Sequence, residues 1–319
     1  MKKNFVSIII VNYNGKNLLK AILESIKKST FKNYGIIIVD NNSSDGSQQF
    51  IKKNYRSVKL IQNKSNLGYS GINSALEYCT GEYILFLNND MELDRNCISR
   101  LVDTIKKDKN TVMAAPRLVN YYNKSLKSGG TWVSRSFYSG HIKGNGKSPS
   151  EVPYLGVGLI KKNFVDDFGY LFDPDYFIYA EDLDLGLRIR LNGKKIAFEP
   201  NAVIYHMHAV TTKKSGMAFT TFLMERNSLI TFFKILSFKD IVLYFPYVFG
   251  IRLFAIVKDL LTLRINLALA RLKAILWLAF NISIVCKKRK ETQKYKKVED
   301  KYIFDVFSEK YLFKKKVIV

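Results

Sequence analysis

The chain has 319 residues, 47% hydrophobic and 24% charged, which is enough to bury a substantial core and to form one catalytic domain with an appendage. Its formal net charge of +24 predicts an anionic partner, such as nucleic acid, acidic lipid headgroups or a phosphorylated substrate. Three cysteines at positions 79, 97 and 286 show no CxxC spacing, which argues against a disulfide framework or a cysteine zinc site and for a reducing cytosol.

The N-terminal half alternates predicted strands and helices. Its basic and apolar start is similar to a signal peptide, but the apolar run stops at Asn12 without a small-residue cleavage site, so we interpret Val6 to Val11 as a buried first strand. Further strands are expected at residues 36–39, 58–61 and 82–87, with helices between them. This alternation predicts a mostly parallel sheet with helices on both faces.

Polar residues follow three of these strands. Asn12 ends the first strand, Asp40 ends the second, and Asn88-Asn89-Asp90 follow the fourth. In open α/β sheets, ligands bind beyond the carboxyl ends of the strands, so we expect these side chains to share one rim. After the third strand, Asn66 and Gly68 lie in a loop whose backbone is expected to pass close to the ligand.

The middle of the chain contains a glycine-rich stretch and then an acidic helix. Residues 118–153, which include Trp132, are predicted to form a mobile loop or hairpin that serves as a lid or an acceptor contact. Glu181, Asp182 and Asp184 occupy the first turn of a predicted helix. Acidic residues at this position either cap the helix or form an active site.

The composition changes at about residue 239. Residues 240–319 contain 17 Lys and Arg against seven Asp and Glu, so this part of the chain is expected in a different environment from the rest. We therefore predict a catalytic domain over residues 1–238 and a basic helical extension over residues 239–319, associated with a membrane.

Two apolar stretches in this extension, residues 241–257 and 265–286, approach the roughly 20 residues that a bilayer span requires. Arg252 interrupts the first, and Arg271 and Lys273 interrupt the second, each at a cost of about 2.5–3.5 kcal/mol near the membrane centre. We therefore predict amphipathic helices that lie in an anionic leaflet. Clean spans and an ordinary helical extension or oligomer surface are the alternatives.

Six short motifs occur in a fixed order along the chain. They read VSIIIVNYNG at residues 6–15, VDNNSSD at 39–45, NLG at 66–68 with Asn73, FLNND at 86–90, EDLDL at 181–185 and PNAVIYH at 200–206. Together they resemble the family 2 glycosyltransferases, and in particular their rhamnosyltransferase-like branch. The resemblance implies an α/β protein with the GT-A fold, in which a mostly parallel mixed sheet is flanked by helices. It also implies transfer of a sugar from a nucleotide diphosphate donor with inversion.

The resemblance implies that the donor binds at the ends of the first strands and in the loops that follow them. Asp40 can accept a hydrogen bond from a uracil or thymine imide or from the ribose. The donor-binding residues expected on this basis are Val11, Asn12, Tyr13, Asp40, Asn42, Asn66, Gly68, Asn88 and Asn89.

The expected cofactor is Mg²⁺ or Mn²⁺, because the leaving diphosphate develops negative charge. Asp90, assisted by Asn88, offers the hard oxygen ligands that these ions prefer. The motif departs from the family's DxD form and keeps only its last carboxylate. Two short strands are predicted at residues 195–198 and 202–205, and similar proteins use the histidine at the position of His206 as a metal ligand, with His208 as a second candidate.

Inversion requires one base to remove the proton of the acceptor hydroxyl, an effect worth about 10²–10⁴-fold in rate. Asp182 aligns with the second acidic residue of the family's ED motif and is expected to be this base. Glu181 is expected to support it, and Asp184 to support the helix. Trp132 and Gly156 are the candidate acceptor contacts.

The predicted protein is a metal-dependent inverting glycosyltransferase of cell-surface polysaccharide synthesis. Its expected donor is dTDP-rhamnose or a UDP-hexose, and its acceptor is a glycan or is lipid-linked. It is expected to be cytoplasmic and peripheral on the inner face of the membrane, held by the anionic surface, with insertion of its C-terminal region as a variant of this hypothesis. Nucleic acid is not an expected partner, because the positive charge concentrates in the tail.

Other classes fit the sequence less well. A Rossmann dehydrogenase would carry GxGxxG after the first strand, and a nucleotidyltransferase a basic glycine-rich loop, where this chain has Asn12-Tyr13-Asn14-Gly15. The alternatives left open are a catalytically inactive, glycosyltransferase-like membrane scaffold and a nucleotidyltransferase of related fold.

Overall fold

The computed structural model describes residues 1–142, 150–207 and 216–311. The strands are β1 (Lys2–Asn12), β2 (Tyr34–Asp40), β3 (Lys59–Gln62), β4 (Gly81–Asn88), β5 (Met91–Leu93), β6 (Thr111–Asn120), β7 (Leu126–Ser128), β8 (Thr131–Val133), β9 (Ser139–His141), β10 (Glu151–Val152), β11 (Gly158–Lys161) and β12 (Lys195–His206). The helices are α1 (Lys16–Lys27), α2 (Ser47–Asn54), the 3-10 helix η1 (Gly68–Tyr78), α3 (Cys97–Lys106), α4 (Lys162–Phe168), α5 (Glu181–Leu191), α7 (Met217–Ile235), α8 (Phe238–Leu261), α9 (Ile265–Phe280), α10 (Ile282–Gln293), α11 (Asp300–Phe304) and the 3-10 helix η2 (Glu309–Tyr311).

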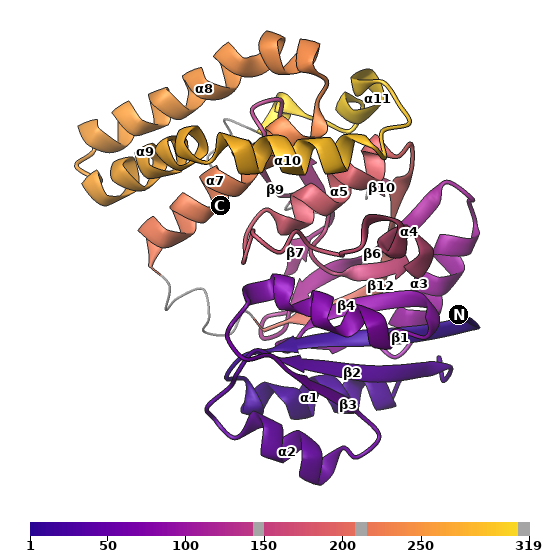
Figure 1. The fold of residues 1–319 in the computed structure, drawn as a ribbon. Helices are drawn as coiled ribbons and strands as arrows, with labels where there is room; N and C mark the ends of the chain where they lie inside the picture. Colours follow the sequence, from indigo (N-terminus) through magenta and orange to yellow (C-terminus); the bar gives the residue numbers. More distant parts are fainter. Residues whose placement is uncertain (143–149, 208–215, 312–319) are drawn as a thin grey trace.

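One mixed sheet organises the first two thirds of the chain, with helices on both of its faces (Figure 1). Its strand order is β10-β12-β6-β11-β4-β1-β2-β3, with β5 paired to β12 and β7 to β6. The strands β1 to β4 run parallel to one another, whereas β11 runs antiparallel between β4 and β6. The predicted fold, a mostly parallel mixed sheet flanked by helices, is confirmed.

Strand β1 lies at the centre of the parallel part, between β2 and β4. Its residues Ile8, Ile9 and Ile10, whose side chains alternate between the two faces, are fully buried, because a parallel strand covered on both faces needs apolar side chains on both. The strand ends at Asn12, which pairs in register with Asp40 at the end of β2. The sheet therefore brings both polar residues to one edge, as the sequence predicts.

Strand β12 differs from its prediction, which placed two short strands at residues 195–198 and 202–205. The structure has one strand with a register shift between Glu199 and Val203. Pro200 lies at this irregularity and has no N–H to donate, so it interrupts the ladder without ending the strand. The strand continues to His206, and its full length carries that histidine to the rim of the sheet.

The stretch at residues 118–153 was predicted to be a loop or hairpin, and its described part contains short antiparallel strands, of which β10 pairs with β12. Strand β7 pairs with β6, and β8 with β9 form a separate two-stranded sheet. Residues 143–149, which include part of the predicted glycine-rich loop, lie outside the described residues.

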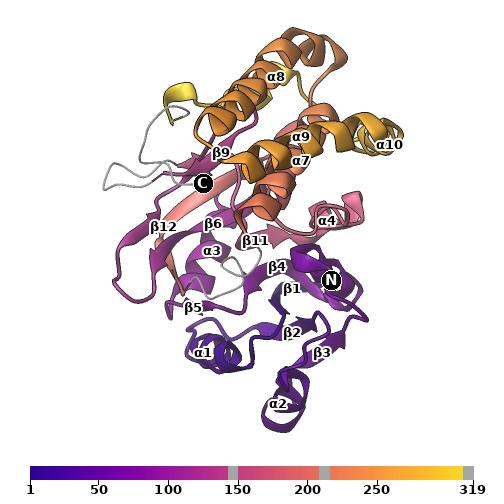
Figure 2. The same ribbon diagram turned by 90° about the vertical axis from the view of Figure 1, so that its left-hand side faces the viewer.

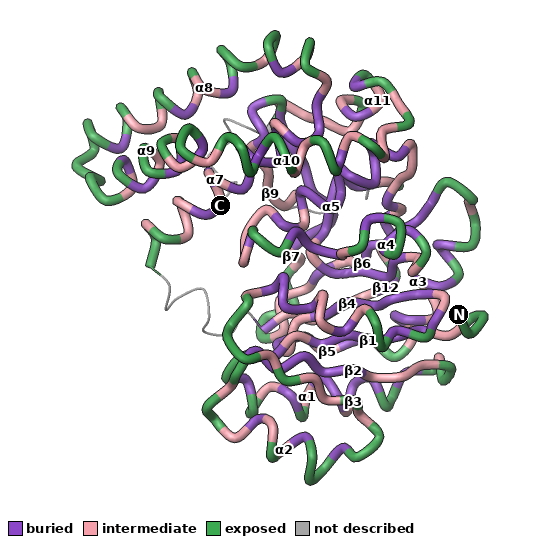
Figure 3. The backbone as a smooth tube through the Cα atoms, viewed as in Figure 1, coloured by how far each residue is buried: buried purple, intermediate pink, exposed green. Residues whose placement is uncertain are grey.

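Helix α5 lies between two hydrophobic cores. Leu185 and Ile189 belong to the core of the sheet, whereas Leu183 and Leu187 pack with side chains of α7, such as Phe232, in a second core. Figure 3 shows α5 buried along its length, while α8 at the outer edge of the molecule is largely exposed. The predicted boundary after residue 238 falls at the first residue of α8, and it stays a prediction.

The C-terminal helices α7 to α10 pack together beside the sheet (Figure 2). Arg252 of α8 is 1% exposed, and its guanidinium pairs with Glu225 of α7 at 3.0 Å. Arg271 of α9 also pairs with Glu225, and with Asp259 at 2.9 Å. Both arginines point into the protein and tie α8 and α9 to α7, so the charges that interrupt the apolar stretches of sequence are paired inside the protein.

Candidate active site

Three strand ends are joined by side-chain hydrogen bonds at the rim of the sheet. The Asn12 amide donates to Asp40 at 2.8 Å and to the Ser43 hydroxyl at 3.2 Å. The Asn89 amide donates to the Asn12 carbonyl oxygen at 2.7 Å. Because Asn12 and Asp40 are fully buried, this network fixes the ends of β1, β2 and β4 relative to one another.

Asp40, predicted to bind the donor, is occupied by its own chain. Besides the Asn12 bond, its carboxylate accepts from the Ser43 N–H at 2.9 Å, the Ser43 hydroxyl at 2.6 Å and the Gln48 amide at 2.8 Å. A nucleotide base would have to replace one of these donors. The exposed neighbours are Tyr13, 39% exposed, and Asn42, whereas Val11 is partly buried.

The loop with Asn66 and Gly68 approaches another part of the chain. Gly68 has φ +64°, and a Cβ there would lie 2.1 Å from the Phe177 carbonyl oxygen, so glycine is required. The Tyr69 N–H donates to the same oxygen at 2.7 Å, while Asn66 accepts from the Gly68 N–H at 2.9 Å. The close approach is therefore to the segment before α5, and a donor contact of this loop stays a prediction.

Tyr69 joins this loop to the predicted base and was not singled out from the sequence. Its hydroxyl donates to the Gly156 carbonyl at 2.9 Å, and a Cβ on Gly156 would meet the Asp182 carboxylate at 3.2 Å. Burial, and the nearby charges of Glu181, Asp182 and Asp90, raise the pKa of Tyr69 well above its usual value. In the sequence, the feature that could have pointed to Tyr69 is its position directly after Gly68.

Glu181 and Asp182 form a carboxylate pair at the start of α5, where the prediction placed them. Burial raises the pKa of Asp182 to about 6. Burial and the charge of Asp182 raise the pKa of Glu181, which is 7% exposed and whose Oε2 has no hydrogen-bond partner within the described residues. A half-buried carboxylate with a pKa near neutrality is suited to general-base catalysis.

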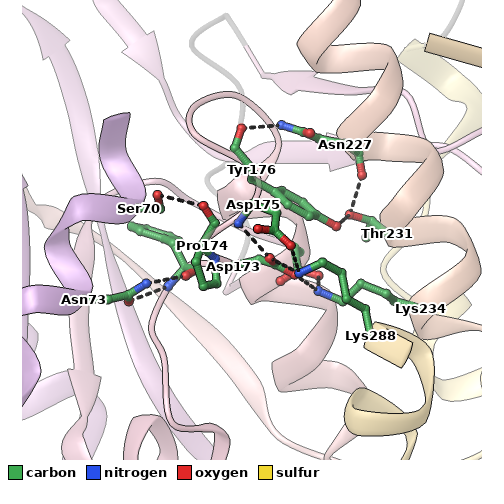
Figure 4. Close-up of polar contacts among 12 residues, drawn as sticks. Ser70, Asn73, Asp173, Pro174, Asp175, Tyr176, Asn227, Thr231, Lys234 and Lys288 are labelled. Carbon is green, nitrogen blue, oxygen red and sulfur yellow. Dashed lines mark hydrogen bonds and ion pairs between the residues drawn. The ribbon is translucent and has the colours of Figure 1, made fainter. Parts of the chain in front are cut away.

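Asp184, in the same turn, has a different environment. It is fully buried and pairs with Arg188 at 2.8 Å and with Lys234 of α7 at 2.7 Å. Lys234 also pairs with Asp173 at 2.6 Å, and Lys288 of α10 contacts Asp173 at 2.6 Å. Figure 4 shows the two lysines meeting Asp173. Asp184 thus supports the helix from its inner side.

The backbone before α5 is strained. Phe177, Tyr179 and Ala180 have φ values of +63°, +70° and +59°, a conformation that costs side-chain-bearing residues about 1–3 kcal/mol each. Such a segment persists only where surrounding contacts hold it.

Asp90 and His206 are the two potential metal ligands that the structure brings together. The Asp90 carboxylate and His206 Nε2 are 3.2 Å apart, because β12 pairs with β5 and sets His206 opposite Met91. Within residues 1–142, 150–207 and 216–311, no three His, Cys, Asp or Glu side chains are grouped to hold an ion. Asn88 is partly exposed beside Asp90, and His208 lies outside the described residues.

These groups fit a divalent ion whose shell is completed by the substrate. Mg²⁺ commonly binds through one or two carboxylates plus phosphate oxygens, and an imidazole beside a carboxylate is also compatible with Mn²⁺.

Of the two candidate acceptor contacts, Gly156 lies against Asp182, as described above. Trp132 is 4% exposed within β8, so its ring could stack on a sugar only if the β8–β9 hairpin moved. An acceptor role for Trp132 stays a prediction.

Comparison with known proteins supports the family resemblance of the motifs. Residues 7–158 match the model of glycosyl transferase family 2. The N-acetylglucosaminyl-diphospho-decaprenol L-rhamnosyltransferase of Mycobacterium tuberculosis is 23% identical over 236 residues, which are 64% of this chain and 76% of that protein. The UDP-Glc:alpha-D-GlcNAc-diphosphoundecaprenol beta-1,3-glucosyltransferase WfgD of Escherichia coli is 28% identical over 148 residues, 41% of this chain and 58% of that protein.

A solved structure has the same fold. The crystal structure of GalNAc-T7 with UDP, GalNAc and Mn²⁺ superposes with a TM-score of 0.59 at 18% identity, over 71% of this chain and 47% of that one. The resemblance in the motifs is therefore confirmed: the chain carries a glycosyl transferase family 2 domain on a GT-A fold and is a glycosyltransferase.

Proposed function

Proceeding from this family, we propose that the chain transfers a sugar from a nucleotide diphosphate donor to a lipid-linked acceptor, with inversion, in cell-surface polysaccharide synthesis. The proposed donor is dTDP-rhamnose or a UDP-hexose, since the relatives are named as a rhamnosyltransferase and a UDP-Glc glucosyltransferase. Both names also carry a polyprenol diphosphate acceptor. The observation that carries the proposal is the Asp182 carboxylate, whose pKa of about 6 suits it to deprotonate a hydroxyl held beside Gly156.

In this mechanism the acceptor oxygen attacks the anomeric carbon from the face opposite the diphosphate. The carbon–oxygen bond to the diphosphate breaks, the nucleotide diphosphate leaves, and the acceptor proton moves to Asp182. Glu181 shares the buried site, and its raised pKa keeps the charge of the pair low, so that Asp182 is the member that ionises near neutral pH. Tyr69 fixes the Gly156 backbone through its hydrogen bond.

Asp90 and His206, with Asn88, would hold Mg²⁺ or Mn²⁺, and the ion would offset charge on the leaving diphosphate. Tyr13 and Asn42 would contact the base and ribose from the exposed side of the rim. The buried residues Asn12 and Asp40, with the half-buried Asn89, would shape the floor beneath them, and Asn66 and Gly68 would border the site.

We extend the proposal to membrane attachment through α8 and α9. From Val242 to Val257, the exposed side chains are all uncharged, because Arg252 points inward. Phe254 and Leu261 are 67% and 81% exposed. Contiguous apolar surface of this kind is rare on proteins that contact only water. Exposed Lys258, Arg264 and Lys287 would meet anionic headgroups.

By length and composition, α8 could also cross a bilayer. Helices α9 and α10 meet the same criterion only when taken together, as one span bent by 73°. We propose insertion into one leaflet, since α8 offers lipid a single face and its other face binds α7 and α9. In Figure 1 the turn between α8 and α9 lies on the same side of the molecule as the end of β1, so a membrane-bound acceptor would approach the rim.

The enzymatic proposal is tested with UDP-glucose, UDP-galactose, dTDP-rhamnose and GDP-mannose, each incubated with Mn²⁺ or Mg²⁺. Wild type should release one nucleotide diphosphate. Asp90→Ala should lose release, and Asp182→Asn should slow it by about 10²–10⁴-fold with unchanged nucleotide affinity. Asp166→Asn, at an exposed acidic residue on α4, is the control. Binding without release by wild type would favour the inactive scaffold.

Membrane attachment is tested by flotation with phosphatidylcholine vesicles containing or lacking phosphatidylglycerol. Phe254→Glu should abolish binding, whereas Tyr122→Glu, at an aromatic residue 72% exposed on the sheet side, should not change it. Equal binding of both variants would contradict the assignment of this face.

A further inference from the structure

One side chain of α7 binds three backbone carbonyls of the strained segment before α5. Asn227 of α7 is fully buried, and its amide nitrogen lies 3.0, 3.2 and 2.7 Å from the carbonyl oxygens of Tyr176, Ile178 and Tyr179. Its own carbonyl oxygen accepts from Arg226 Nε at 2.9 Å, which orients the amide so that its N–H groups face the segment. Figure 4 shows Asn227 reaching Tyr176 from α7.

The carbonyls that Asn227 binds lie in the same segment as the strained backbone. Tyr179 and Ala180 are in the left-handed region without being glycines, and Ala180 is the residue from which α5 starts. Ala180 makes no side-chain hydrogen bond that would cap α5. The direction in which Glu181 and Asp182 leave the segment is therefore set by the backbone at Tyr179, one of the carbonyls that Asn227 binds.

The opposite side of the segment is fixed independently. Tyr69 donates its N–H to the Phe177 carbonyl at 2.7 Å, and Asn73 of η1 donates to the Phe172 carbonyl and accepts from the Leu171 N–H. The segment is thus clamped between η1, within the family 2 domain, and α7, beyond residue 158 where the family match ends.

We propose that Asn227 is a positioning residue for the catalytic carboxylates: its amide holds the left-handed turn at residues 177–180 so that Asp182 faces Gly156. The inference rests on the proposed function for its catalytic consequence and on the geometry alone for the positioning. It makes α7 a part of the active site, although no residue of α7 lies in the six sequence motifs.

Asn227→Asp is the variant of choice, because it keeps size and shape and replaces the donor by an acceptor that repels the three carbonyls. Thr231→Val is the matched control. Thr231 is one turn further along α7, fully buried, and its hydroxyl bonds the Tyr176 hydroxyl at 2.9 Å, so the control loses a buried hydrogen bond to the same segment without touching the left-handed backbone.

Two measurements are made on the full chain. In hydrogen exchange, amides of residues 176–183 should lose protection in Asn227→Asp and keep it in Thr231→Val. In donor hydrolysis with the active sugar nucleotide, kcat of Asn227→Asp should fall about 10- to 100-fold, as expected for misplacement by about 1 Å, with KM within about twofold. Thr231→Val should retain kcat within about twofold.

Unchanged exchange at residues 176–183, or a kcat equal to that of the control, would overturn the positioning role. If Asn227→Asp does not fold, Asn227→Ala is measured in the same way against Thr231→Val. If wild type hydrolyses none of the sugar nucleotides while exchange responds as expected, the proposed function fails and the positioning of the segment stands.

Discussion

The two sides of the active site are stabilised by different means. On the side of β1 and β2, neutral amides and hydroxyls bond one another and Asp40 across short loops, over an apolar sheet core. On the side of α5, a strained segment carries buried carboxylates and is held by charged and amide side chains from α7 and α10. The bonds of the rim therefore all lie within the first 90 residues of the chain, whereas the placement of Asp182 depends on residues that follow it by 40 or more positions.

This difference suggests a division of tasks. A rim in which the buried side chains of Asn12 and Asp40 already have partners presents a preformed surface, and a nucleotide that binds beside them leaves these bonds in place. On the α5 side, Asp182 must stay available to react. The residues that fix its position therefore have to bind the backbone and side chains around Glu181 and Asp182, and not the two carboxylates themselves. Buried ion pairs are suited to this, because removing one partner leaves an uncompensated charge and so strongly disfavours other arrangements.

The largest change in folding stability is expected from Lys234→Ala, which removes a cation from the α5 side. Lys234 is fully buried between Asp173 and Asp184, and its removal would leave both carboxylates with one cation fewer. The free energy of unfolding should fall by about 3–5 kcal/mol, measured by urea denaturation at pH 7. Lys290→Ala, at an exposed lysine of α10, should change it by less than about 0.5 kcal/mol. Equal effects of both changes would mean that the ion pairs do not hold this side.

A smaller change in folding stability, and a gain in place of a loss, is expected from Asp182→Asn at neutral pH. Because burial raises the pKa of Asp182 to about 6, the folded state binds the proton more tightly than the unfolded chain, whose aspartate titrates near 3.9. Folding stability of wild type should therefore decrease as the pH rises from about 4 to about 6, and stay lower above that. Asparagine carries no such penalty, so the variant should be more stable than wild type by about 1–3 kcal/mol at pH 7 and lose this advantage at pH 4.

The same pKa predicts the pH dependence of transfer. The rate should fall about tenfold per pH unit below pH 6, where Asp182 is protonated, and level off above it. Thermal unfolding of wild type and Asp182→Asn over pH 4–8 and the pH–rate profile of wild type together test this. A variant less stable than wild type at neutral pH would show that the carboxylate is structural.

The rim was largely predictable from the sequence, and the carboxylate support was not. Asn12, Asp40 and Asn89 follow apolar strands whose parallel pairing brings them to one edge, so the local pattern sufficed. Their bonding to one another was not predictable, because it depends on side-chain rotamers in the folded state. Asn227 and Lys234 lie inside a helix with an ordinary apolar pattern, and nothing near them in the sequence indicates which distant carbonyls or carboxylates they meet.

The C-terminal extension shows the same limit. Its helices follow from composition and length, but the sequence shows only that Arg252 and Arg271 interrupt the apolar stretches, and not which way their side chains point. Both pair with Glu225 of α7. That Glu225 lies opposite them depends on how the helices pack in the folded protein. The inward turn of the arginines removes charge from the outer face, and this strengthens the apolar surface that the sequence alone seemed to interrupt.

The smallest effect is expected on the rim, from Ser43→Ala. The Ser43 hydroxyl donates to Asp40 at 2.6 Å and accepts from the Asn14 N–H at 2.9 Å, and its loss should lower the free energy of unfolding by about 1–2 kcal/mol. Ser44→Ala, at the exposed neighbouring residue, should cost less than about 0.5 kcal/mol. Because the Ser43 N–H, Asn12 and Gln48 still bind Asp40, the rim should keep its shape and UDP affinity should change by less than about threefold. A larger loss of UDP affinity, together with a small loss of stability, would show that the shape of the rim depends on a single hydrogen bond. The two sides of the active site would then not differ in the way described.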